Sequence, residues 1–247
     1  MDNSQKIGVS ESGEVAFNLD IFDRLFDGNI IITKRLTTKL IDKLVDNKDK
    51  IILHVTCTGW GNTILEPFVP TLETTRKKFG ELIQKGFPIE HCVLRIDPCI
   101  PTEEGISIML TVVEAFSDTG IKRVRFSVLD MYDHVKKRFK EAGIEIPYET
   151  FHAPLEDRKR LYDLLVEMGK KYGFDVESCA EPGIESISCL SQKDIDILGL
   201  SDKITLVGQK EQRSNCHCPS NKTSLFKTKP ERCLQKCLYC FWRSEKS

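Results

Sequence analysis

The sequence contains no apolar run that approaches the roughly 20 residues of a membrane-spanning helix. Its first six residues, Met1-Asp-Asn-Ser-Gln-Lys6, precede no apolar stretch, so we expect neither a signal peptide nor a transit peptide. An excess of one charge is also missing, since 36 lysines and arginines stand against 37 acidic residues. Internal repeats and low-complexity tracts are absent. These absences predict an ordinary globular protein of the cytoplasm with no membrane partner.

Cysteine, in contrast, is abundant, with ten residues in a chain of 247. In a reducing cytoplasm, cysteine binds metals more often than it forms disulfides. Five cysteines are scattered among apolar residues, where we expect most of them to be small core side chains. These are Cys57, Cys92, Cys99, Cys179 and Cys189. The other five fall close together and carry the strongest functional signal: Cys216, Cys218, Cys233, Cys237 and Cys240.

Three of the grouped cysteines, Cys233, Cys237 and Cys240, have the spacing C-x-x-x-C-x-x-C, with Tyr239 just before the last. Several thiolates on one short loop can converge on a single iron–sulfur cluster. Three close ligands with no obvious fourth would leave one iron with an open position, which is where metal sites do chemistry. The spacing therefore favours an iron–sulfur cluster in this segment.

Structural zinc is the alternative interpretation of the same segment. Cys216, His217 or Cys218 could combine with two of the later three cysteines to give four tetrahedral ligands. The protein would then be a non-catalytic barrel with a zinc tail that binds nucleic acid or a protein. With a cluster instead, Cys216 and Cys218 are spare: they could bind a second metal, supply a thiol hydrogen donor or brace the loop, and bracing the loop is the favoured role.

The cysteine segment also mixes basic and aromatic side chains. This mixture is compatible with contact to DNA, although a run of charge is more often a solvated surface. The basic residues are Lys222, Lys227, Lys229, Arg232, Lys236 and Arg243, and the aromatic residues are Phe226, Tyr239, Phe241 and Trp242.

Short apolar, β-branched runs alternate with amphipathic segments along most of the chain. The runs predict strands at 29–33, 51–56, 92–96, 123–128, 175–179 and 204–207. The segments predict helices at 37–45, 72–85, 104–117, 155–172 and 193–198, and a basic helix that ends at Ala142. Such alternation produces parallel strands joined by right-handed crossovers.

We therefore predict an α/β fold, a partial TIM-like β/α barrel of about six units, with a doubly wound open sheet as the alternative. The predicted organisation is a polar leader over residues 1–18, the partial barrel over 19–209, and a cysteine-rich iron–sulfur segment over 210–247.

Both architectures place reactive groups at the carboxyl ends of the strands. Arg95, Asp97 and Glu181 follow three of these strands and are the predicted catalytic residues. The planar Arg95 fork suits a carboxylate or phosphate, and the two acids suit ribose hydroxyls or an amino group. For Arg95 and Asp97, an ion pair that only closes the barrel end is the alternative. Four further residues at this end are predicted to bind the cofactor: Thr58, Gly59, Gly61 and Ser127.

Six parts of the chain carry a resemblance to a known family. They are Ile32-Thr-Lys34, His54-Val-Thr-Cys-Thr-Gly-Trp-Gly61, Leu65-Glu-Pro67 with Val69-Pro70, Arg95-Ile-Asp-Pro98, Phe126-Ser127 with Asp130-Met-Tyr132, and Gln212-Arg-Ser-Asn-Cys-His-Cys218 leading to the C-x-x-x-C-x-x-C motif. From about residue 19 onward, the chain resembles a radical-SAM-like family of unknown function whose cluster motif lies at the carboxyl terminus. It departs from mainstream radical SAM enzymes, whose motif follows the first barrel strand, and it lacks their Gly-Gly-Glu element.

This resemblance implies that Cys233, Cys237 and Cys240 bind the 4Fe-4S cluster, that Tyr239 packs beside it, and that one iron holds the amino and carboxylate groups of S-adenosylmethionine (SAM). It implies reductive cleavage of SAM to a 5′-deoxyadenosyl radical, with an external one-electron reductant. The implied substrate is a small molecule or a DNA base. The narrowest expectation is an isomerase of phage thymidine hypermodification, which moves a glycine attachment from nitrogen to carbon in the host cytoplasm.

Overall fold

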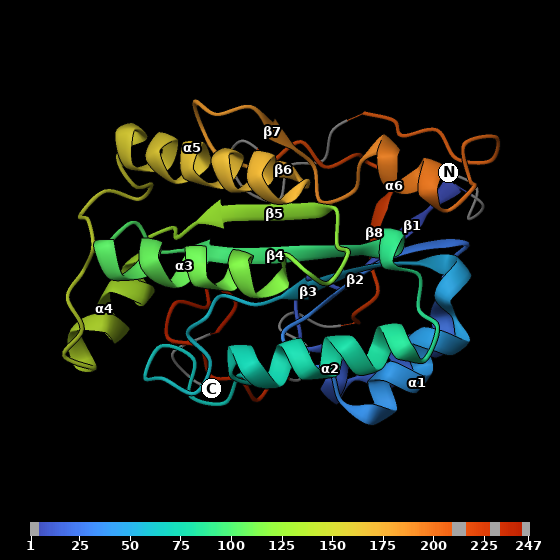
Figure 1. The fold of residues 1–247 in the computed structure, drawn as a ribbon, viewed down its shortest axis with the longest axis horizontal. Helices are drawn as coiled ribbons and strands as arrows, with labels where there is room; N and C mark the ends of the chain where they lie inside the picture. Colours follow the sequence, from blue (N-terminus) through green and yellow to red (C-terminus); the bar gives the residue numbers. More distant parts are fainter. Residues whose placement is uncertain (1–4, 209–215, 228–232, 244–247) are drawn as a thin grey trace.

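The computed structural model describes residues 5–208, 216–227 and 233–243. These residues form one curled, eight-stranded sheet in which every pairing is parallel (Figure 1). The strand order is β7-β6-β5-β4-β3-β2-β1-β8, so β8 returns to pair with β1 as in a β/α barrel, while β7 and β8 form the two edges. The strands are β1 Ile7–Val9, β2 Gly28–Thr33, β3 Ile51–Thr56, β4 Cys92–Cys99, β5 Arg123–Val128, β6 Asp175–Cys179, β7 Ser186–Ile187 and β8 Lys222–Ser224.

Six α-helices connect or follow the strands. They are α1 Thr38–Asp46, α2 Leu72–Gln84, α3 Glu103–Phe116, α4 Asp133–Glu141, α5 Leu155–Tyr172 and α6 Gln192–Ile197. Threonine hydroxyls cap three of them, because Thr37, Thr71 and Thr102 accept a hydrogen bond from a backbone N–H of the first turn. Within the described residues, no helix is both long and apolar enough to cross a membrane.

The sheet separates two apolar layers. On one face, β-strand residues such as Ile31, Val55 and Phe126 pack with buried side chains of α1 to α5 in the main core. On the other face, Ile30 and Ile52 belong to a smaller core, which α6 and the apolar residues flanking it complete. Because successive strand residues point to opposite faces, strands buried on both sides read as continuous apolar runs, as β2 and β3 do.

The structure confirms an α/β barrel-like fold, and its sheet has more strands than the predicted count of about six. β1, β7 and β8 contain only two or three residues each, which is too short to leave an apolar pattern. β1 lies within the 1–18 segment that composition presents as a polar leader, so part of that segment belongs to the sheet. The predicted strand at 204–207 is wrong: the segment carries no strand pairing, and Ile204 packs in the smaller core instead.

The close approach of α3 to the preceding loop gives a testable prediction. A Cβ atom on Gly105 would lie 2.2 Å from the backbone oxygen of Ile100, whereas one on Gly80, within α2, would meet nothing within 4 Å. We expect Gly105→Ala to lower the free energy of unfolding by about 1–3 kcal/mol through overpacking. Gly80→Ala should raise it by up to about 1 kcal/mol, since alanine favours a helix. Urea unfolding of both variants measures the contrast, and equal midpoints would contradict the tight contact.

Candidate functional site

A cavity of about 600 Å³ lies at the carboxyl ends of the central strands. Its size falls in the range of about 300–1,000 Å³ that is usual for small-molecule and cofactor sites. Five parts of the chain line it: residues 10–14 after β1, the ends of β2 to β5, the Cys179–Ala180 and Cys189 positions, Cys216 with Lys222, and the segment from Cys233 to Arg243. The site is therefore assembled from both ends of the chain and from the strands between them.

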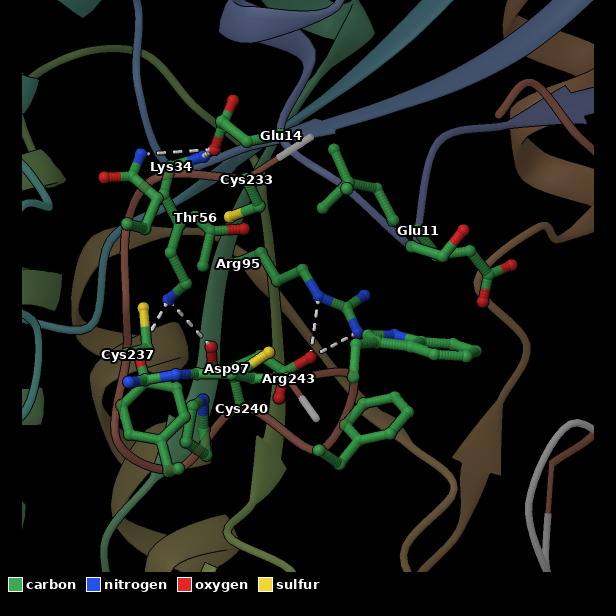
Figure 2. Close-up of a pocket in the computed structure, with 18 of the residues that line it drawn as sticks. Glu11, Glu14, Lys34, Thr56, Arg95, Asp97, Cys233, Cys237, Cys240 and Arg243 are labelled. Atoms are coloured by element: carbon green, nitrogen blue, oxygen red, sulfur yellow. Dashed lines mark hydrogen bonds and ion pairs between the residues drawn. The ribbon is translucent and has the colours of Figure 1, made fainter. Parts of the chain in front are cut away.

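The C-x-x-x-C-x-x-C motif forms part of the cavity wall. Cys233, Cys237 and Cys240 all line the cavity, and Figure 2 shows them around it with Lys34 and Asp97 nearby. Cys233 is exposed, Cys237 is buried and Cys240 is intermediate. The loop is anchored at Cys240, whose backbone oxygen accepts a 2.6 Å hydrogen bond from Arg138. All three predicted cluster ligands thus lie on one cavity.

Lys34, which sequence reasoning did not select, fixes Tyr239 beside the cysteine motif. Its Nζ donates to Glu66 Oε1 at 2.8 Å, to the Tyr239 hydroxyl at 3.0 Å and to the Asp97 backbone oxygen at 3.2 Å. These contacts use all three ammonium donors. The Tyr239 hydroxyl also donates to the buried Glu66 carboxylate. Burial lowers the pKa of Lys34, but the Glu66 and Cys237 charges raise it, and the net rise keeps the amine protonated.

Arg95 and Asp97 form an ion pair at the cavity, next to Lys34 (Figure 2). Arg95 Nε donates to Asp97 Oδ2 at 2.9 Å, its second terminal nitrogen donates to the same oxygen, and Ser127 donates to Oδ1 at 2.6 Å. Burial lowers the pKa of Arg95 while Asp97 raises it, with a net shift well above the ordinary value. The arginine fork is thus already occupied, and Asp97 presents a partly exposed, oriented carboxylate to the cavity.

The predicted site residues fall into three groups. Six line the cavity: Arg95, Asp97, Tyr239, Cys233, Cys237 and Cys240. Thr58 and Ser127 lie behind its wall, where Thr58 donates to Glu66 at 2.6 Å and Ser127 to Asp97.

The remaining three, Glu181, Gly59 and Gly61, do not line the cavity. Glu181 accepts a 2.8 Å hydrogen bond from the backbone N–H of Val128. A Cβ atom on Gly59 would meet Ile108 of α3, and one on Gly61 would meet the Pro70 backbone. Both glycines therefore permit close packing within the protein.

Other charged residues, which the sequence did not predict as site residues, also line the cavity. Glu14 lines it and accepts a 3.0 Å hydrogen bond from the Lys34 backbone N–H, and burial raises its pKa. Lys222, expected on a basic surface, is buried and forms an ion pair with Glu11. Lys34 follows β2 at its carboxyl end, so the rule that selected Arg95 could also have selected Lys34. For Glu11 and Glu14 the sequence offers no comparable signal.

A buried polar row continues across the sheet away from the cavity. Arg95, Arg125 and Glu177 are paired neighbours on β4, β5 and β6. Arg125, whose side chain is 0% exposed, donates to Glu177 at 3.0 Å and to the Cys189 backbone oxygen at 2.8 Å. Arg123 joins Glu177 at 3.2 Å and Asp194 at 2.7 Å. These pairs bind α6 and the Cys189 loop to the sheet.

Comparison with known proteins identifies one family. A family model described as a domain of unknown function, DUF1848, matches residues 26–242. This match spans the cavity-lining ends of β2 to β5 and the whole cysteine motif. No curated protein matches the sequence. The chain therefore belongs to the DUF1848 family.

Proposed function

We propose that this protein is a radical SAM enzyme that binds a 4Fe-4S cluster through Cys233, Cys237 and Cys240. One observation carries the proposal: three thiols with the C-x-x-x-C-x-x-C spacing share a cavity of about 600 Å³ at the carboxyl ends of a barrel-like parallel sheet. Barrel enzymes place their reactive groups at this end. The same cavity can therefore contain a cluster, SAM and part of a substrate.

The residues present fit such a cluster. The motif would supply three thiolates and no fourth, so one iron of a bound cluster would keep a coordination position for SAM. Burial raises the pKa of the Cys237 thiol above its ordinary value, and the charge of Lys34 offsets only part of that rise. A fixed cation beside a ligand thiol favours the thiolate that iron requires. When bound, the cluster and SAM would supply reductive C–S bond cleavage and hydrogen-atom abstraction from the substrate.

The chain's own residues position and protect the reactants. Arg95 and Ser127 hold the Asp97 carboxylate in one orientation, so that it can accept hydrogen bonds from an ammonium group or ribose hydroxyls. Lys34 holds Tyr239 beside the motif. Aromatic rings close one side: Phe241 stacks on Tyr132 with centroids 5.7 Å apart, and Phe241 and Trp242 lie 4.6 Å apart. Such rings exclude water and offer a face for a nucleobase.

We further propose that the substrate is a modified nucleotide or DNA base. The aromatic rings on the cavity wall support this class, since bases stack on aromatic side chains. The family resemblance supports the narrower form of the proposal, isomerisation of N-linked to C-linked glycinyl thymidine in phage DNA. An external one-electron reductant is required in either case.

Anaerobic reconstitution with iron and sulfide tests the cluster. We expect about four irons per chain in the wild type and almost none in the Cys233→Ala, Cys237→Ala, Cys240→Ala triple variant. With dithionite and SAM, the wild type should release 5′-deoxyadenosine and the triple variant should not. Cys92→Ala is the matched control, because Cys92 is buried in the main core at the opposite end of β4. A wild type that gains no iron, or a triple variant that keeps it, would contradict the proposal.

A further inference from the structure

Four other cysteines meet at the cavity, from three parts of the chain, and Cys179, Cys189 and Cys216 line it. Cys179 ends β6, Cys189 lies between β7 and α6, and Cys216 and Cys218 precede β8. All four are buried, with at most 6% of each residue exposed, and they form a cluster of their own with Ala180. The exposed His217 separates Cys216 from Cys218, and both cysteines are buried.

The thiols are in contact with one another. Cys179 Sγ and Cys189 Sγ are 3.5 Å apart. The Cys189 thiol also contacts that of Cys218, which in turn contacts Cys216. All ten cysteines lie within the described residues, and none forms a disulfide. Four buried thiols in one cluster match the ligand number of a structural zinc site.

The spacing favours one ion rather than a cluster. With Zn–S bonds of about 2.3 Å and tetrahedral angles, neighbouring sulfurs lie about 3.8 Å apart. The 3.5 Å contact between Cys179 and Cys189 is close to such an edge. A 4Fe-4S cluster needs its ligand sulfurs much farther apart, because each one binds a different iron.

Two cationic side chains lie next to the thiols, as expected where thiolate ligands would carry negative charge. Lys222 Nζ donates to Cys218 Sγ at 3.3 Å, and Arg95 donates to Cys189 Sγ at 3.9 Å. Four thiolates around a divalent ion carry a net charge of about −2. Hydrogen bonds from cations to ligand sulfurs stabilise that charge and orient the ligands. Lys222 is buried here rather than on the surface, which this role explains.

We propose that Cys179, Cys189, Cys216 and Cys218 bind one tetrahedral divalent metal ion of the zinc class, separate from the Cys233, Cys237 and Cys240 motif. In this structure the contacts run in a chain from Cys179 to Cys216, and no three metal-binding side chains of the described residues already enclose an ion. Binding would draw the two ends of this chain together by side-chain rotation. The ion would fasten the C-terminal segment to the end of β6 and so brace one wall of the cavity.

Metal analysis of the protein purified without chelators, under reducing and anaerobic conditions, tests the site. We expect about one zinc per chain in the wild type. The Cys92→Ala control and the triple variant of the C-x-x-x-C-x-x-C motif should retain it. Cys179→Ala with Cys189→Ala, and separately Cys216→Ala with Cys218→Ala, should lose at least about nine tenths of it. Cobalt substituted into the wild type should give the visible absorption of a tetrahedral thiolate site.

Native mass spectrometry of the wild type adds a measurement that does not depend on the folding of any variant, since one bound ion gives a defined mass increase. A wild type without metal, zinc retained by both double variants, or a Cys179–Cys189 disulfide in place of the ion would overturn the proposal. Iron with sulfide that depends on these four residues would also overturn it. The outcome is independent of the proposed radical SAM function, because the triple variant separates the two sites.

Discussion

Glu177→Leu is expected to lower the free energy of unfolding by about 3–5 kcal/mol, because it leaves buried guanidinium groups without their carboxylate. Arg125 has a fully buried side chain and would keep only the Cys189 backbone oxygen as a partner. Arg123 would keep Asp194. For a domain of this size, such a loss lowers the melting temperature by roughly 10 °C. Thermal and urea unfolding, monitored by circular dichroism, measure the effect.

Two comparison variants distinguish the effect of leaving a buried charge unpaired from the general effect of removing a carboxylate. Glu103→Leu removes the partner of Arg160 from an exposed pair and should leave the unfolding midpoint almost unchanged. Arg125→Met combined with Glu177→Leu should recover much of the stability, since apolar groups of similar volume can replace a buried ion pair at little cost. If Glu177→Leu is no less stable than Glu103→Leu, the polar row does not hold the sheet to α6.

Lys34→Met is expected to reduce both stability and iron retention. The Glu66 side chain is fully buried and would lose its cation, which should lower the free energy of unfolding by about 3–5 kcal/mol. Tyr239 would lose one of its two polar partners beside the motif. Loss of such a supporting contact typically weakens a metal site about 10- to 100-fold. Unfolding curves and iron content after reconstitution and gel filtration measure the two effects separately.

The matched control is Lys85→Met, which removes an exposed ion pair with Asp42 and should change neither quantity. Adding Glu66→Gln to Lys34→Met removes the stranded carboxylate, so stability should recover in part. Iron retention should stay low, because the cation beside Cys237 is still missing. A Lys34→Met protein that melts and binds iron like the wild type would refute the role given to this lysine.

Local patterns predicted much of the fold. The structure confirms predicted strand or helix boundaries at β3, β5, β6 and α5, which combine strong apolar content or helical periodicity with clear turn residues at their ends. Thr37 begins α1 as an N-cap residue should. β1 and β8 could not be predicted in this way, since each is three residues long and exists because Ile7 and Val9 meet Lys222 and Ser224. That pairing depends on tertiary structure.

In the candidate site, too, some residues could be predicted from the local sequence and others depend on tertiary structure. Arg95 and Asp97, selected by their position after a strand, and the three motif cysteines, selected by their spacing, all line the cavity. Loop glycines cannot be interpreted by position alone, because Gly59 contacts α3 and leaves the cavity to other residues. No spacing in the sequence predicts the contacts of Cys179 and Cys189 with Cys216 and Cys218. They arise only when the sheet brings distant segments together.

The pairing of β8 with β1 also sets an order of events during translation. The ribosome completes β1 to β7 and all six helices before it delivers Lys222–Ser224 and the cysteines that follow. Until then, β1 is an open sheet edge, and such edges invite association with other chains. A nascent chain also lacks the wall formed by residues 233–243, so any cofactor must be inserted after that segment has emerged. Slower synthesis and an early supply of iron and chaperones should therefore favour recovery of a correctly assembled protein.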